Sequence, residues 1–298
     1  MKRIFKTLCL LLTLVFTLGF TASLTACEDI KQIKVNISVF DIEKSQQVET
    51  SITVDLYRHL APDTVDAIIS YVEKGYYNDT IFYKNNMYTN IMFGDYKVVD
   101  KALVQNNADY VLPIDGEFVA NGLKMDGEFK FTEGTIGLWR DWQASGDFKN
   151  NNDEAFNSGK GTLFIPTETK TEYNDYFCIL GKIEMEIGST NETAFRLLKA
   201  IVSSSKHYVN FTTYYTGDVT VKEDGTIDYS GLTYHQMLTQ DFNDRYNEDE
   251  NTIDGLEVFK AEGSEFIKYN KQTLQLPVAV AGSTITTVYA KITTVTVL

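Results

Sequence analysis

Apolar and polar residues alternate along two segments near the start of the chain, 34–41 and 51–57. Successive side chains of a β-strand point to opposite faces, so this alternation predicts a half-buried antiparallel pair. Similar strand-like runs recur through the rest of the sequence. They occupy residues 79–84, 88–93, 110–114, 128–132, 134–139, 161–165, 176–183 and 284–297.

Two segments show helical spacing instead. Pro62 stands at the start of the first, apolar residues then recur every three or four positions, and Gly75 ends it. The second covers residues 189–205 and begins with a capping box formed by Ser189 and Glu192. Two helices among many antiparallel strands predict a mainly β fold, a closed barrel with helices over its open ends, because closure removes exposed strand edges. A β-sandwich with peripheral helices is the alternative.

The N-terminal segment has the layout of an export signal. Three basic residues precede an apolar run without charges over residues 7–24. The run ends in LTAC at residues 24–27, which resembles the lipobox of bacterial lipoproteins, where the signal is cleaved before a lipid-bearing cysteine. We therefore expect a signal peptide over residues 1–26 and lipidation of Cys27, which anchors the chain on the extracytoplasmic face of the cell membrane. A transmembrane anchor and a plain secretory signal are the alternatives.

The net charge limits the partners that can be expected, and the cysteine count limits the possible disulfides. The net charge is −14, and removal of residues 1–26, which hold three basic residues and no acidic one, makes it −17. So acidic a chain argues against nucleic acid and against electrostatic docking on anionic lipid. Cys178 is then the one cysteine besides Cys27, so no intramolecular disulfide is expected. The three histidines are scattered singly, and we expect neither a metal nor a cofactor.

Four segments, in order, carry a family resemblance: ITVDLYRHLAPDTVDAIISYVEKGYYNDTIF (52–82), GTIGLWR (134–140), GTLFI (161–165) and YNDYFCILGKI (173–183). They resemble the cyclophilins, the peptidyl-prolyl cis-trans isomerase family built on a closed eight-stranded antiparallel barrel with two helices. Residues 27–36 are expected to form a short tether. The resemblance implies a barrel made of 37–205 and 284–298, and an insertion over 206–283 before the last strand.

The resemblance also implies a site. Lys84 stands where the family has the arginine that hydrogen-bonds the prolyl peptide as its C–N bond twists, which makes Lys84 the candidate catalytic residue. Lysine keeps the positive charge of that arginine but lacks its planar fork of donors. The candidate substrate-binding residues stand at the family's other site positions: Thr89, Asn90, Met92, Trp139, Thr162, Phe164, Tyr173 and Phe177.

The substitutions leave two functions open. Phe164 matches a proline-facing phenylalanine of the family, whereas Trp139 places a large ring where an alanine leaves space. The first expectation is a weak prolyl isomerase that acts on proline-containing exported polypeptides. The alternative is a module that binds a peptide or protein without turnover, and a solute-binding lipoprotein is a third, weaker option. The isomerase reading requires that the side chains of Lys84 and Phe164 face the same hollow.

Overall fold

The computed structural model describes residues 30–85, 90–123, 129–140, 156–217, 220–221, 227–228, 231–248, 250, 252–253, 256–257 and 272–298 of the chain. Thr89 and Cys27, a predicted substrate-binding residue and the predicted lipidation site, lie outside these residues.

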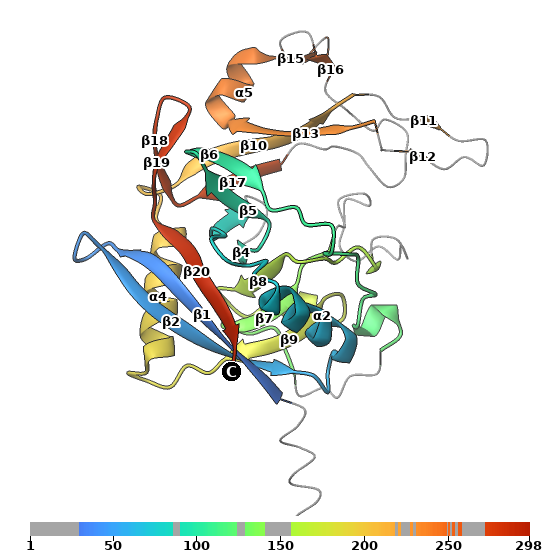
Figure 1. The fold of residues 1–298 in the computed structure, drawn as a ribbon, viewed down its shortest axis with the longest axis vertical. Helices are drawn as coiled ribbons and strands as arrows, with labels where there is room; N and C mark the ends of the chain where they lie inside the picture. Colours follow the sequence, from blue (N-terminus) through green and yellow to red (C-terminus); the bar gives the residue numbers. More distant parts are fainter. Residues whose placement is uncertain are drawn as a thin grey trace, which may run out of the picture.

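Eleven strands form one antiparallel sheet, so the mainly β class is confirmed (Figure 1). The strand order is β13-β10-β17-β3-β4-β8-β7-β9-β2-β1-β20, in which strands far apart in sequence become neighbours. The strands are β1 (Ile30–Asp41), β2 (Gln46–Tyr57), β3 (Tyr83–Asn85), β4 (Asn90–Phe93), β7 (Thr135–Leu138), β8 (Leu163–Pro166), β9 (Cys178–Ile183), β10 (Val209–Thr216), β13 (Thr233–Leu238), β17 (Gln272–Leu276) and β20 (Ala290–Val297).

The first two strands pair over twelve residues, from Ile30 opposite Tyr57 to Asp41 opposite Gln46. The tether expected over residues 27–36 is therefore wrong for residues 30–36, which belong to β1. Polar side chains alternate there with buried ones, so this segment is a strand with one solvated face rather than a linker.

Both predicted helices are present, as α2 (Pro62–Glu73) and α4 (Thr190–Val202). The Ser189 hydroxyl accepts a hydrogen bond from the Glu192 N–H at 3.1 Å, which confirms the predicted cap of α4. The start of α2 is capped from a distance, because the Glu117 carboxylate accepts the Thr64 N–H at 2.8 Å. A third helix, α5 (Thr239–Arg245), was not predicted, and it begins without a side-chain cap.

The main hydrophobic core lies between the sheet and these helices. Buried side chains of β1, β2, β9 and β20 pack there against the apolar faces of α2 and α4. Representative members are Ile37, Val54, Ile68, Leu198 and Ile292.

The closed eight-stranded barrel is not confirmed, because the sheet has eleven strands and two ends, β13 and β20. β20 meets the segment before β3 through an isolated bridge between Ile81 and Lys291. Two backbone hydrogen bonds flank it, from the Phe82 N–H to the Ala290 carbonyl at 3.1 Å and from the Ile292 N–H to the Thr80 carbonyl at 2.8 Å. The strands supplied by residues 206–283 continue the sheet past β3, which the barrel expectation did not include.

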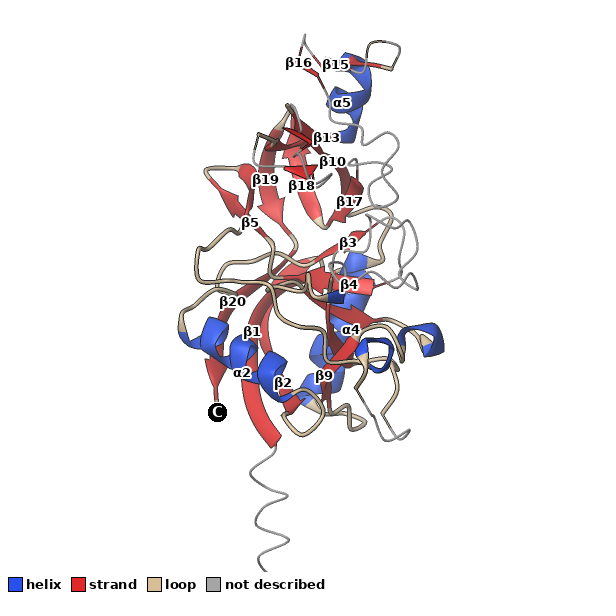
Figure 2. Ribbon diagram, turned by 90° about the vertical axis from the view of Figure 1, so that its right-hand side faces the viewer, coloured by secondary structure: helices blue, strands red, loops and turns tan. Residues whose placement is uncertain are grey.

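The described parts of residues 206–283 join the sheet through β10, β13 and β17, and these strands lie at the end of the molecule opposite the start of β1 (Figure 2). α5 lies beside β10 and β13 (Figure 1). Smaller pairings accompany these elements: β11 (Thr220–Val221) with β12 (Ile227–Asp228), β15 (Thr252–Ile253) with β14 (Tyr246–Asn247) and β16 (Leu256–Glu257), and β18 (Val278–Ala281) with β19 (Thr284–Val288).

A further hairpin, β5 (Tyr96–Val99) with β6 (Ala102–Gln105), was missed by the sequence reading. Its turn residues Asp100 and Lys101 both have positive φ, as a two-residue hairpin turn of this kind requires. The sequence lacks the glycine that would have signalled this turn. Conversely, the strand expected at 110–114 is reduced to one bridge between Ile114 and Gly159.

Candidate functional site

The register of four strands gathers most of the predicted site residues on one face of the sheet. Met92 of β4 lies opposite both Tyr83 of β3 and Phe164 of β8, and Phe164 lies opposite Gly137 of β7. Directly opposed residues of antiparallel strands present their side chains on the same face. This face, which we call the outer face, is distinct from the face that packs against α2 and α4. The predicted residues Met92, Phe164, Tyr173 and Phe177 all belong to its hydrophobic cluster, with Trp139 packed against it.

Phe164 is fully buried at the centre of this face. Its ring stacks on Phe131, with 5.3 Å between ring centroids, and meets Trp139 edge-on at 5.6 Å. Tyr173 and Phe177 approach it edge-on at 5.9 and 5.3 Å. Trp139 also stacks on Phe177 at 5.4 Å. Four aromatic rings therefore surround Phe164, the side chain that the family resemblance expects to contact a proline ring of the substrate.

The backbone of β7 also closes in on the Phe164 ring, at Gly137. A Cβ atom on Gly137 would lie 2.6 Å from Phe164 ring atoms and 2.7 Å from the Phe131 ring. Glycine is thus needed at position 137, because only a residue without a side chain lets the rings of Phe164 and Phe131 pack directly on the backbone of β7. This close approach adds to the enclosure of Phe164.

Asn90, another predicted binding residue, is also buried on this face. Its side-chain amide donates a hydrogen bond to the Tyr173 hydroxyl at 3.3 Å, while its carbonyl oxygen has no partner among the described residues. Burial raises the pKa of Tyr173 to about 12, against the smaller opposing influence of the bond from Asn90. Both predicted residues are therefore engaged with each other inside the protein.

Lys84 does not join this group. It lies opposite Ile91, which in turn lies opposite Ile165, and both isoleucines belong to the main core on the other side of the sheet. Lys84 and Phe164 therefore project from opposite faces of the sheet. The expectation that they flank one hollow is wrong, and the physical reason is the two-residue period of a strand, by which a shift of one position changes the face.

Tyr83 takes the place on the outer face that was expected for Lys84. Its ring is buried, and its hydroxyl donates a hydrogen bond to the Asp95 carboxylate at 2.7 Å. Burial raises the pKa of Asp95 to about 6, against weaker opposing effects of hydrogen bonds that include those from Tyr83 and Thr162. Thr162, a predicted binding residue, is thus placed beside Asp95, and its backbone carbonyl accepts the Trp139 N–H at 2.8 Å. Residues 81–83 are all apolar or aromatic, so the sequence carried no signal for the face on which Tyr83 lies.

The strands from residues 206–283 cover part of the same face. β17 pairs with β3, with Gln275 opposite Lys84, and Leu274 joins the cluster that contains Phe164. The Tyr234 hydroxyl of β13 lies 2.6 Å from the Tyr96 hydroxyl of β5. Strands β13 and β17 are therefore packed against the site.

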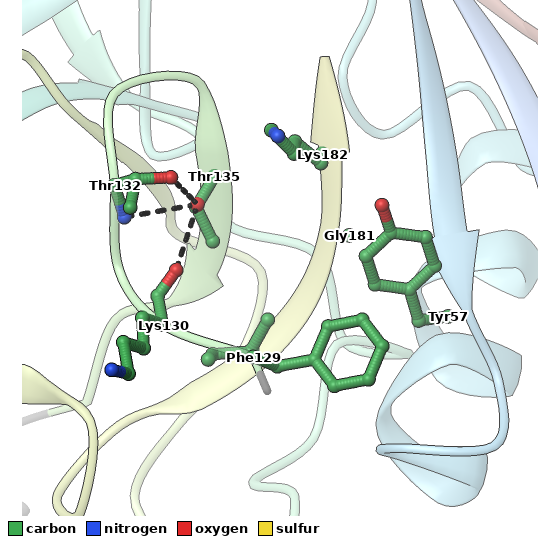
Figure 3. A pocket seen from close by; sticks show the side chains of 8 residues that line it. Tyr57, Phe129, Lys130, Thr132, Thr135, Gly181 and Lys182 are labelled. Carbon is green, nitrogen blue, oxygen red and sulfur yellow. Dashed lines mark hydrogen bonds between the residues drawn. The ribbon is translucent and has the colours of Figure 1, made fainter. Parts of the chain in front are cut away.

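An open pocket of about 300 Å³ lies farther along the outer face (Figure 3). Tyr57 and Phe129 form its aromatic wall, with 5.3 Å between their ring centroids. The Thr135 hydroxyl at its edge donates to the Lys130 carbonyl at 3.2 Å. Burial, followed by the charges of Glu184 and Asp55, raises the pKa of Tyr57. The lining residues are Tyr57, Phe129, Lys130, Thr132, Thr135, Ile179, Gly181 and Lys182.

Within the described residues, no group of three or more histidine, cysteine, aspartate or glutamate side chains is placed to hold a metal ion. No helix in the described part of the chain is both long and apolar enough to cross a membrane.

The chain belongs to the cyclophilin family. The family model described as "Cyclophilin type peptidyl-prolyl cis-trans isomerase/CLD" matches residues 39–213, which is more than half of the sequence. This confirms the family expected from the four sequence motifs.

Solved structures are similar to this chain only at low TM-scores. A cyclophilin-type peptidyl-prolyl cis-trans isomerase of Cryptosporidium parvum is similar with a TM-score of 0.37 and 13% identity, over 69% of this chain and 98% of that one. A second structure of that protein, in the presence of the dipeptide Ala-Pro, is similar with a TM-score of 0.36 and 15% identity, over 67% and 98% of the two chains. No curated protein matches the sequence.

Proposed function

We propose that this chain is a lipid-anchored, extracytoplasmic cyclophilin-type protein that binds proline-containing exported polypeptides without accelerating prolyl isomerisation at the family's usual position. The observation that carries this proposal is the enclosure of Phe164 by Phe131, Trp139, Tyr173 and Phe177. A prolyl ring cannot contact Phe164 unless these rings move.

The chemistry of isomerisation explains why this enclosure matters. The partial double bond of the peptide C–N gives a rotation barrier of about 18–20 kcal/mol. An enzyme lowers it by holding the proline ring and by aiming a donor at charge that develops during the twist. Here the ring site is filled, and Lys84, the expected donor, projects from the other face of the sheet. Neither requirement is met around Phe164.

The pocket beside Tyr57 supports binding at a different place on the outer face. Its volume of about 300 Å³ is at the lower end of the size of ligand sites. The aromatic wall of Tyr57 and Phe129 fits an apolar side chain of an extended segment, because aromatic rings contribute contact area at low entropic cost. The hydroxyl of Thr132 and the ammonium group of Lys182 provide polar partners for its backbone.

A prolyl-peptide isomerisation assay on residues 28–298 tests the catalytic half of the proposal. We expect cis-trans exchange at the spontaneous rate, which is tens to hundreds of seconds per event. Acceleration of tenfold or more would overturn the proposal. If Lys84→Ala removed that acceleration, the second candidate function, a weak isomerase with Lys84 as donor, would replace it. That candidate is favoured by family membership.

Peptide titration tests the binding half. A fluorescent extended X-Pro peptide should bind the lipid-free chain, and Phe129→Ser should weaken binding by about tenfold, because it removes one aromatic wall. Val99→Ser, an exposed position in β5 away from the pocket, is the matched control. Absence of binding, or equal loss in both variants, would contradict a peptide site at this pocket.

A further inference from the structure

One end of the molecule collects exposed apolar side chains. Ile30 is 42% exposed, Ile187 is 100% exposed and Val297 is 37% exposed, and Leu298 beside it is also exposed. We call these four residues the base. Single exposed apolar residues are common on proteins, but several gathered at one place mark a contact surface.

The connections of the sheet bring these residues to the same end. Val297 lies opposite Ile33, three residues after Ile30, and the Leu298 N–H donates to the Gln32 carbonyl at 2.9 Å. The turn that contains Ile187 joins β9 to α4, and it lies at the same end of the molecule as the start of β1 and the end of β20 (Figure 1).

The Ile187 turn is held in place rather than merely extended into solvent. The Asn191 side chain donates to the Thr53 carbonyl at 3.1 Å and to the Glu184 carbonyl at 3.0 Å. The Gly188 N–H donates to the Glu192 carboxylate at 3.0 Å. These bonds tie both sides of the turn to β2 and to the start of α4, so Ile187 projects from a supported position.

We propose that the base docks on the surface of the lipid bilayer that holds the acylated Cys27. The proposal rests on the lipid anchor, which is part of the proposed function. Two residues separate Cys27 from Ile30, so the three Cα–Cα steps between them span at most about 11 Å. Each headgroup layer is about 5–8 Å thick. A short tether of this kind keeps Ile30 next to the bilayer, and its neighbours in the base then meet the boundary of headgroups and acyl chains.

Apolar contact, rather than charge, drives this docking. The chain carries a net charge of −17 once residues 1–26 are removed, so anionic lipid repels it. Docking should therefore occur on zwitterionic phosphatidylcholine and should not need anionic lipid.

Docking of the base also orients the rest of the molecule. Strands β10, β13 and β17 lie at the opposite end and would face away from the membrane (Figure 2). Tyr57, which lies opposite Ile30, would keep the pocket of Figure 3 close to the bilayer, where exported chains emerge.

Site-specific fluorescence on the acylated protein in phosphatidylcholine vesicles tests the proposal. The variants Ile187→Cys and Val99→Cys each receive an environment-sensitive dye. Val99 is the matched control because it is an exposed apolar residue of β5, whose hairpin with β6 lies far from the start of β1 (Figure 2). Native Cys178 is buried and is not expected to react. We expect a blue-shifted emission and quenching by a nitroxide-bearing lipid at position 187, and neither at position 99.

Two outcomes would overturn the proposal, and they can be told apart. In the first, the chain is acylated but the dye at position 187 shows the same emission and quenching as the dye at position 99. This outcome contradicts docking of the base and leaves the anchor intact. The second outcome has two parts. The mass of the mature chain shows no acyl group on Cys27, and Cys27→Ala associates with membranes as the parent chain does. This outcome contradicts both the lipid anchor and the docking. Loss of the shift at position 187 when Val297→Asp is added would confirm that the base acts as one surface.

Discussion

The indole of Trp139 lies edge-on against the ring of Phe164, with 5.6 Å between the ring centroids. This contact occupies space next to the residue that cyclophilin resemblance assigns to proline binding. The same indole stacks on Phe177, so two contacts hold it there. The Trp139 indole is therefore a fixed part of the cluster that encloses the Phe164 ring.

Replacing Trp139 should reopen that space at a cost in stability. We expect Trp139→Ala to lower the free energy of unfolding by about 2–4 kcal/mol, because it removes contacts with two rings. The variant should also bind an Ala-Pro peptide more tightly than the parent chain does in isothermal titration. Tyr289→Ala, which removes a partly buried ring that packs on Phe40, is the control. It should lose stability without gaining affinity, and equal affinities in all three proteins would refute the blocking role of the indole.

Gly137 should resist even the smallest side chain. We expect Gly137→Ala to cost about 1–3 kcal/mol of stability, because its Cβ would overlap the rings of Phe164 and Phe131. In a Phe164→Leu background the same change should cost less, since the smaller side chain leaves room. Urea denaturation of the four proteins gives the coupling energy. A cost that is the same in both backgrounds would show that the Phe164 ring is not the obstacle.

Stability should depend on pH through Asp95. Its pKa is about 6 in the folded chain, whereas a free aspartate has a pKa of about 3.9, so the folded state holds the proton more tightly. The free energy of unfolding should therefore fall as the pH rises from about 4 to about 6, by on the order of 3 kcal/mol. Asp95→Asn should lack this contribution, and the exposed Asp100→Asn should retain it. Parallel stability curves for the parent and Asp95→Asn would contradict the assignment.

The hydroxyl pair of Tyr96 and Tyr234 should couple the insertion to the rest of the sheet. Tyr234→Phe should cost about 1–2 kcal/mol, because it leaves the buried Tyr96 hydroxyl without this partner. Adding Tyr96→Phe should cost little more, which gives a coupling energy of about 1 kcal/mol in a double-mutant cycle. Additive losses would mean that the two hydroxyls do not stabilise each other.

Local features of the fold could be predicted where local chemistry controls them. Ser189 and Glu192 identified the start of α4 because capping needs only a few neighbouring residues. The alternation of residues 51–57 identified β2 because its two faces meet core and solvent. By contrast, the hairpin of β5 and β6 was missed, since Asp100 and Lys101 adopt positive φ without a glycine signal. The expected tether failed at residues 30–36 because pairing with β2 makes a polar segment into a strand.

The structure brings several of the predicted site residues together, but it places Lys84 on the other face of the sheet. Met92, Phe164, Tyr173 and Phe177 do belong to one cluster, as motif matching indicated. Phe131 and Tyr83 were absent from that set although they contact its members.

The sequence by itself determined the family, the mainly β class and two of the helices, because periodicity and short motifs are properties of neighbouring residues. Only the tertiary structure decided that Lys84 and Phe164 project from opposite faces, and that the Phe164 ring is enclosed. It also placed β10, β13 and β17, which residues 206–283 supply, in the main sheet. These outcomes depend on strand register and on contacts between strands that are distant in sequence, and a shift of one residue in register moves a side chain to the other face of the sheet.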